Sequence, residues 1–390
     1  MLLAIATPVY PFNPTQLSAQ EKQEWEQLIQ RFNEPRTVRL LAGRLWSLTH
    51  GGDSKKVEEI LNLLTVLDPK SARRPAINTK EFKNTIASFL DSDDDHVAGF
   101  AATLLGVLGD LSFAPRIAKL LDKKDPPDDP EKFVPPITSR ASAAFALSLM
   151  EARDYVQKVA LMLKSKNDYD RAGAAIALGQ FKAREYAKDV AELLKSESGM
   201  SSGAESAIYA LMEMGAGAEY AAQFVSVMRD DHGDTTETAV FALVKLGDKQ
   251  HAKEIAQLLS QEYRKADAAV ALAIMGATEY TDQIARLLND KDSLTRVAAL
   301  NALGIMRATK YQLQVAKNLK DPESFVPIHA AFALVLMDAD RYAKRIIPMV
   351  EHLHRQNLNL IDPQPFVEEE LQQINNRFRS SFERMKNRLR

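Results

Sequence analysis

Short apolar blocks recur along the chain at a nearly constant interval. Each block is anchored by a leucine, with alanine four residues earlier and, in every block but the first, alanine one residue earlier. These three positions lie on one face of a helix, and the small residues allow a second helix to pack closely beside the leucine. The pattern predicts one helix per block, which we name helix A. The anchors are Leu105, Leu147, Leu178, Leu211, Leu243, Leu272, Leu303 and Leu334, at steps of 42, 31, 33, 32, 29, 31 and 31 residues.

A second helix, helix B, is predicted after each helix A. An aromatic residue or histidine follows each anchor by eight or nine residues, and Ile, Val or Phe follows it by twelve or thirteen. A helical pair repeated at this period indicates a stack in which each unit packs on its neighbours. We therefore predict an all-α fold, a right-handed α-solenoid (superhelix) of stacked antiparallel helix pairs.

The repeats occupy the middle of the chain. About eight of them cover residues 91–350, and residues 36–90 are predicted to form degenerate helical repeats. Residues 1–35 are predicted to form an N-terminal arm, rich in proline up to residue 14, followed by a capping helix. The one long step between anchors comes from residues 123–136, where five prolines predict a protruding loop.

Residues 351–390 are predicted to form a linker and an amphipathic helix. The glutamates at 368–370 and the basic residues near the end suit the helix dipole. The apolar stripe is best explained as a cap on the last repeat, and the alternative is a helix that docks on a partner or on a second copy of the chain. The stripe consists of Val367, Leu371, Ile374, Phe378, Phe382, Met385 and Leu389.

Composition narrows the possible functions. The formal net charge is −2, so no overall field attracts nucleic acid or acidic lipid. The chain has no cysteine, which excludes disulfides, thiol nucleophiles and cysteine-ligated metal sites. No apolar run approaches the roughly 20 residues of a membrane span. The expected location is cytoplasmic, or periplasmic or secreted if an upstream signal is missing.

Two segments carry the detailed repeat pattern, residues 289–304 in full and residues 170–175 in part. They resemble the HEAT-like repeats first recognised in phycobiliprotein lyases, and the resemblance covers roughly residues 91–350. It implies that the acidic loop and an arginine at the start of helix A tie one repeat to the next. Arg140, Arg171, Lys265 and Arg296 occupy that position here, whereas Ala98, Ala204, Thr236 and Pro327 do not.

No catalytic or metal-binding motif is complete. The loop at Asp91 begins like a calcium site, but His96 replaces the required glycine and Ala102 the required glutamate. His352 and His354 are two residues apart, so they point to different sides of a helix. Some HEAT-like enzymes bind iron through His-Glu dipeptides, and this sequence contains none. We predict no catalytic residue, no metal and no cofactor.

The exposed side of helix B is the predicted contact surface. We expect a non-enzymatic scaffold that binds another protein in a concave groove formed by the B helices. The charges on this side are mixed, so a nucleic-acid partner is not favoured. The candidate partner contacts are Arg116, Lys158, Lys188, Lys253, Gln283, Gln314 and Arg345.

Two other functions stay open. The resemblance to lyase repeats allows a lyase or chaperone-like factor for attaching a prosthetic group, and weak nucleic-acid binding is the remaining alternative. Self-association through the C-terminal helix is compatible with either.

Overall fold

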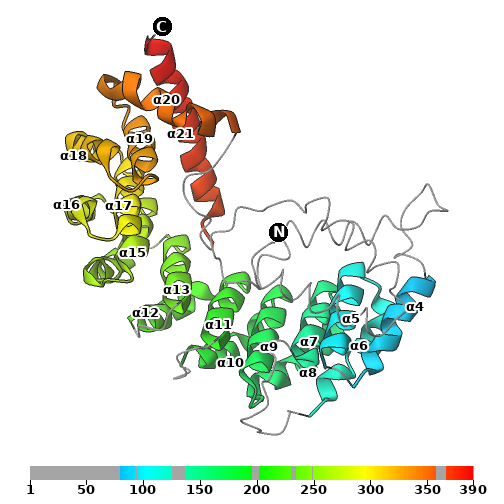
Figure 1. The fold of residues 1–390 in the computed structure, drawn as a ribbon. Helices are drawn as coiled ribbons and strands as arrows, with labels where there is room; N and C mark the ends of the chain where they lie inside the picture. Colours follow the sequence, from blue (N-terminus) through cyan, green and yellow to red (C-terminus); the bar gives the residue numbers. More distant parts are fainter. Residues whose placement is uncertain are drawn as a thin grey trace, which may run out of the picture. The chain divides into compact units, whose positions relative to one another are not determined.

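The computed structural model describes residues 80–93, 95–124, 138–195, 202–229, 234–247, 249–356 and 366–389. Within these ranges the structure has helices and no strand, and the helices pack against their neighbours in sequence order (Figure 1). The predicted all-α solenoid of helix pairs is therefore confirmed. The predicted N-terminal arm, the degenerate repeats up to residue 79 and the insert beyond residue 124 lie outside the described residues.

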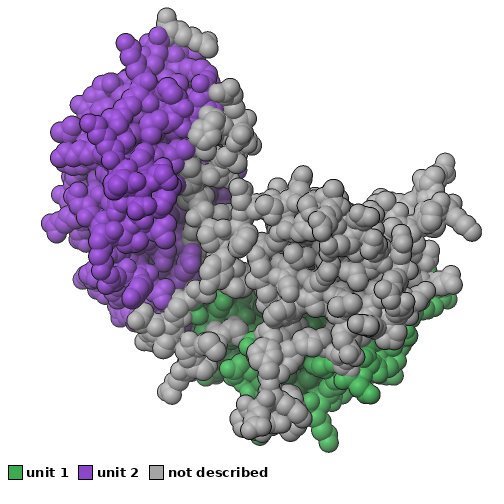
Figure 2. All heavy atoms as spheres, viewed as in Figure 1, with its two compact units in different colours: residues 1–223, 232–235 green, residues 224–231, 236–390 purple. Residues whose placement is uncertain are grey.

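The chain divides into two compact units (Figure 2). Unit 1 contains residues 1–223 and 232–235, and unit 2 contains residues 224–231 and 236–390. Each unit is a stack of its own, and each has its own apolar core of leucine, alanine and phenylalanine from the helix pairs.

Each anchor leucine lies in a longer helix, and a shorter helix follows it, as predicted. In unit 1, α4 (Lys80–Ser88) is followed by three pairs and one further A helix: α5 (Asp95–Leu108) with α6 (Ala114–Ile117), α7 (Ser139–Leu149) with α8 (Val156–Leu161), α9 (Asp168–Gln180) with α10 (Ala187–Ala191), and α11 (Ser202–Glu213). The next helix, α12 (Ala221–Arg229), begins at the division between the units.

Unit 2 continues the alternation and ends with one additional helix. Its elements are α13 (Asp234–Lys245) with α14 (Ala252–Gln257), α15 (Lys265–Ile274) with α16 (Thr281–Arg286), α17 (Ser293–Ile305) with α18 (Gln312–Lys317), α19 (Val326–Leu336) with α20 (Ala343–Gln356), and α21 (Glu368–Leu389).

Short 3-10 turns flank the B helices. The turns before helix B end at the predicted aromatic position: η4 (Leu111–Phe113), η6 (Arg153–Tyr155), η8 (Arg184–Tyr186), η10 (Gly217–Tyr220), η11 (Lys249–His251), η13 (Thr278–Tyr280), η15 (Thr309–Tyr311) and η17 (Asp340–Tyr342). The remaining turns come after α4 or after a B helix. They are η3 (Phe89–Asp91), η5 (Leu120–Asp122), η7 (Met162–Lys164), η9 (Glu192–Lys195), η12 (Leu258–Ser260), η14 (Leu287–Asn289) and η16 (Asn318–Lys320).

Helix A ends in the same way in both units, with a left-handed residue four positions after the anchor. After Leu147, the Glu151 amide donates to the Ser148 carbonyl and the Ala152 amide donates to the Leu147 carbonyl. This bonding satisfies carbonyls that the end of a helix would otherwise leave unpaired. The left-handed residues are Gly109, Gly215, Gly247 and Gly276, together with Glu151, Lys182, Arg307 and Asp338.

Successive A helices approach each other closely through their small residues. A Cβ on Gly106 of α5 would lie 2.6 Å from the Ala146 Cα of α7, and one on Gly304 of α17 would lie 2.8 Å from the Ala333 Cα of α19. Successive B helices of the described chain contact each other more weakly. The closest approaches between repeats are therefore on the A side, and the concave groove formed by the B helices stays a prediction.

Candidate binding surface

The seven predicted contact residues all lie on B helices, but three of them bind the preceding repeat. The Arg116 guanidinium donates to the Ala87 carbonyl at 2.8 Å and to Asp91 at 2.7 Å. Lys158 repeats this arrangement, donating to the Ala118 carbonyl at 2.8 Å and to Asp122 at 2.7 Å.

Arg345 has the same role in unit 2. Its guanidinium donates to the Leu319 carbonyl, in the turn after the preceding B helix, at 3.0 Å. Helix ends leave carbonyls without intrahelical partners, and these side chains satisfy them. Arg116, Lys158 and Arg345 therefore connect repeats. The side chains that remain as exposed candidate contacts are Lys188, Lys253, Gln283 and Gln314.

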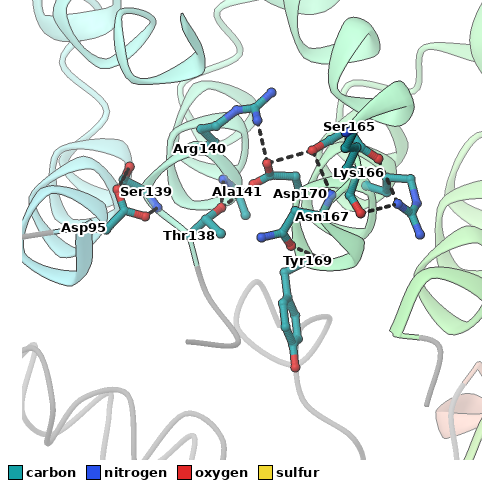
Figure 3. A network of polar contacts seen from close by, with 11 residues as sticks. Asp95, Thr138, Ser139, Arg140, Ala141, Ser165, Lys166, Asn167, Tyr169 and Asp170 are labelled. Carbon is teal, nitrogen blue, oxygen red and sulfur yellow. Dashed lines mark hydrogen bonds and ion pairs between the residues drawn. The ribbon is translucent and has the colours of Figure 1, made fainter. Parts of the chain in front are cut away.

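Arg140, Lys265 and Arg296, at the start of helix A, form the inter-repeat contacts that the resemblance implies. Arg171 instead bonds the loop before its own helix, at the Ser165 and Lys166 carbonyls and Asp168. In unit 1 (Figure 3), Arg140 lies 2.8 Å from the fully buried Asp170 of the next repeat. Thr138 and Ser165 donate to the same carboxylate. With these partners, Asp170 is a structural joint between α7 and α9.

Asp95 forms a similar joint one repeat earlier. Its carboxylate accepts the Ser139 amide at 2.8 Å and the Ser139 hydroxyl at 2.5 Å. Burial raises the pKa of Asp95, but the Ser139 and Lys123 hydrogen bonds outweigh it and hold the pKa below its usual value. Asp91 and Asp95 are thus acidic inter-repeat contacts.

Unit 2 repeats these joints with two further predicted residues. Lys265 donates to Asp290 at 2.7 Å. Arg296 binds Asp321 through two nitrogens, each at 2.8 Å, and both side chains are about nine-tenths buried, at 11% and 8% exposed. A buried, two-bonded arginine–carboxylate pair fixes geometry strongly. The loops that begin successive A helices are therefore held in register.

These fixed loops carry an exposed apolar column that the sequence reasoning missed. Tyr263, Leu294 and Phe325 each lie nine residues before an anchor leucine, in three consecutive repeats of unit 2, and their exposed fractions are 85%, 64% and 38%. We call these three residues the apolar column. Helix spacing places consecutive members about 8–10 Å apart.

The fold does not require apolar residues at this position. In four of the other five repeats the same position holds a polar residue, His96, Thr138, Ser202 or Asp234, and in the fifth it holds Tyr169. The residues that follow Leu294 and Phe325, Thr295 and Val326, are the ones that are buried. Scattered exposed apolar residues are normal, whereas a contiguous apolar surface marks an interaction site. The constant offset from the anchors is the sequence signal that identifies the column.

Ion pairs beside the column keep its loops together. Glu262, next to Tyr263, accepts a contact from Lys291, near Leu294, at 2.5 Å. Lys291 holds the pKa of the Glu262 carboxyl below its usual value through this hydrogen bond and its charge. Both side chains are more than half exposed, so the pair positions the loops and adds little stability.

Two ionisable residues follow the column. Asp267 and His329 each come four positions after a column residue, in the first turn of α15 and of α19. Burial raises the pKa of Asp267 to about 6, and the nearby Arg264 charge opposes this only in part. Burial lowers the pKa of His329 to about 4, so its ring is neutral at pH 7, and its Nδ1 lies 3.1 Å from the Asn301 side-chain oxygen.

The described residues show neither a metal-binding cluster nor a membrane span. No three or more His, Asp or Glu side chains in these ranges are grouped to hold an ion. None of the described helices combines the length and apolar character needed to cross a membrane.

No protein-family model matches the chain, and no curated protein matches it. Among solved structures, the CpcE–CpcF complex of phycocyanin lyase from Nostoc sp. PCC7120 is 18% identical, with a TM-score of 0.38, and the match covers 70% of this chain and 98% of that one. The Escherichia coli protein YibA is 15% identical, with a TM-score of 0.45 and coverage of 78% and 99%. An engineered protein is 17% identical, with a TM-score of 0.42 and coverage of 92% and 99%. The chain is a helical-repeat protein, and its particular family stays a prediction.

Proposed function

We propose that the chain is a non-enzymatic scaffold and that a partner protein docks on the apolar column of unit 2. The observation that carries the proposal is the exposure of three large apolar side chains at one position of three consecutive repeats. Burying such a side chain contributes about 1.5–3 kcal/mol, so three of them supply a substantial part of a binding energy. A matching partner presents apolar groups at the spacing of the repeats.

The predicted helix-B surface has a smaller part in this proposal. Lys188, Lys253, Gln283 and Gln314 stay candidate secondary contacts on the exposed side of the B helices. Arg116, Lys158 and Arg345 are poor probes of binding, because reversing their charge would also break inter-repeat bonds.

Two exposed leucines of one repeat provide a matched test. Leu294 on α17 belongs to the column and is 64% exposed, whereas Leu313 on α18 does not and is 61% exposed. A photo-crosslinking residue at 294 should capture a protein partner that the same residue at 313 does not. With that partner purified, Leu294→Ser should weaken binding about tenfold or more, because the variant buries less apolar surface in the complex. Leu313→Ser should leave the affinity unchanged.

Two results would contradict the column as the docking site. One is equal capture from positions 294 and 313. The other is an unchanged dissociation constant in the triple variant Tyr263→Ser, Leu294→Ser, Phe325→Ser. Because all three side chains are exposed, the triple variant should fold normally, and circular dichroism verifies this.

The prosthetic-group alternative stays a prediction, because no specific contact in the described residues favours it over protein binding. Adding a bilin to the purified chain tests it directly, since a bound chromophore shifts the bilin absorbance.

A further inference from the structure

The C-terminal helix α21 lies along the A helices of unit 2 (Figure 1). The cap hypothesis expects contact with the last repeat, and α21 does pack on α19 and α20. The Phe378 ring lies 4.7 Å from the Phe332 ring of α19. The buried members of the predicted stripe are Val367, Leu371, Ile374, Phe378, Phe382 and Met385, while Leu389 is exposed.

The helix also reaches well beyond the last repeat. Arg377 donates to the Ile305 carbonyl at the end of α17, at 2.8 Å. Glu370 accepts a bond from Lys245 at the end of α13, at 3.3 Å. A helix of 22 residues is about 33 Å long, enough to cross four helices spaced 8–10 Å apart. A simple end cap does not need this reach.

The surface beneath α21 carries opposite charges at its two ends. Lys245 binds the acidic first turn of α21. At the other end, acidic residues form three ion pairs with the basic residues of the last turns of α21. The pairs are Arg384 with Asp338 at 3.4 Å, Lys386 with Glu351 at 2.7 Å and Arg388 with Asp340 at 2.5 Å. This complementarity selects the direction in which a helix lies across the A helices.

The contact of α21 with the A helices buries two polar atoms that it does not satisfy. The Glu370 Oε2 and Arg377 Nε atoms are buried without a hydrogen-bond partner. Burial, together with the neighbouring Arg307 charge, lowers the pKa of Arg377. Unpaired buried polar atoms cost free energy.

From these contacts we infer that the A side of unit 2 is a binding site for an amphipathic helix of a partner, and that α21 occupies it as a built-in competitor. The partner helix has apolar residues along one face, an acidic first turn and basic last turns. This inference is independent of the apolar column, which lies at the opposite ends of the A helices.

A labelled peptide with the sequence of residues 366–390 is a suitable probe, because it carries that chemistry. In the full chain the tethered α21 is present at a high effective concentration and competes. Fluorescence anisotropy should therefore show weak peptide binding to the unmodified chain. Phe378→Ala with Phe382→Ala in the chain weakens α21 and should tighten binding of the unmodified peptide at least tenfold.

Two peptide variants test the charge pattern. A peptide with Arg384→Glu, Lys386→Glu and Arg388→Glu should bind the weakened chain at least tenfold less tightly. The matched control, Ser380→Ala at an exposed position of α21, should bind like the original. Equal binding of the charge-reversed peptide would overturn the proposed recognition.

The unmodified chain offers a test that does not depend on a variant folding. The backbone amides of α21 should exchange hydrogen faster than those of α17 and α19, because detaching α21 should require less free energy than opening those two helices. Equal protection in all three helices would show that α21 is an integral part of the core and would overturn the inference. A dimer of the unmodified chain in light scattering would assign the site to α21 of a second copy and would also overturn it.

Discussion

Asp267 and His329 show how burial of a single residue changes the response of unit 2 to pH. The raised pKa of Asp267 means that the folded state holds its proton more tightly than the unfolded state does. Its favourable contribution is full below pH 3.8 and is lost as pH rises through about 6. His329 acts in the opposite direction, because its lowered pKa makes the folded state lose stability as pH falls from 6.5 through about 4.

Replacing Asp267 with asparagine should separate the two effects. Asparagine keeps the shape but cannot ionise, so the variant should be more stable relative to the parent at pH 7.5 than at pH 4. A shift from 3.8 to about 6 changes this relative stability by about 2–3 kcal/mol. Urea unfolding of both proteins at the two pH values measures it. A pH-independent difference would show that Asp267 titrates normally in the folded protein.

Single positions also show where sequence reasoning stops. The glycines of helix A have two different roles: Gly106 and Gly304 pack against the next A helix, whereas Gly276 is the left-handed end of helix A. Glu151 and Lys182 occupy the same left-handed position without being glycine. Their residue type does not predict the left-handed conformation. The hydrogen bonds that end helix A impose this conformation on whatever residue lies four positions after the anchor.

At the scale of helices, the distance between successive A helices is set by what lies at their contact. Gly106 and Gly99 both lie on α5 and both face α7. A Cβ at 106 would meet the Ala146 backbone at 2.6 Å, whereas a Cβ at 99 would meet the Ser142 hydroxyl at 2.8 Å. A hydroxyl can rotate away, but a backbone atom moves only if the helices separate.

Gly106→Ala should therefore destabilise the protein, and Gly99→Ala should have little effect. Overpacking at 106 costs about 1–3 kcal/mol, and the helix propensity of alanine returns up to about 1 kcal/mol, leaving a net loss of about 1–2 kcal/mol. At 99 the same propensity gain offsets a smaller cost, for a net change below about 1 kcal/mol. Thermal unfolding of both variants compares them. Equal losses would mean that α5 and α7 are less closely fixed than the contact distances indicate.

The helix pairs could be predicted from the anchors, but their layering could not. The alanine columns before each anchor showed that A helices approach closely, and Lys265 and Arg296 bind the next loop as the resemblance implied. How closely each layer packs depends on contacts between repeats on both sides of the stack, and no single repeat contains that information. The stripe of α21 likewise predicted burial of one face, but not that Glu370 would reach Lys245, 125 residues earlier.

At the scale of the whole molecule, contacts between neighbours should keep the effects of a mutation local. The described helices of each unit pack on those adjacent in sequence, and the main exception is α21 within unit 2. In such a stack, stability is close to a sum of repeat and nearest-neighbour contributions. Gly106→Ala in unit 1 and Gly304→Ala in unit 2 create comparable backbone contacts, at 2.6 and 2.8 Å. They form a matched pair for testing how far a disturbance spreads.

Hydrogen exchange resolved by helix should give a crossed pattern for this pair. Gly106→Ala should lower the protection of α5, α7 and α9 while leaving α17 and α19 near their original values, because the helices on which α5 and α7 mainly pack, α4, α6 and α9, all lie in unit 1. Gly304→Ala should do the reverse, and its effect should extend to α21, whose Arg377 is bonded to the end of α17. Equal loss of protection in both units from either variant would mean that the chain unfolds as a single cooperative block, since a nearest-neighbour stack cannot transmit the loss that far undiminished.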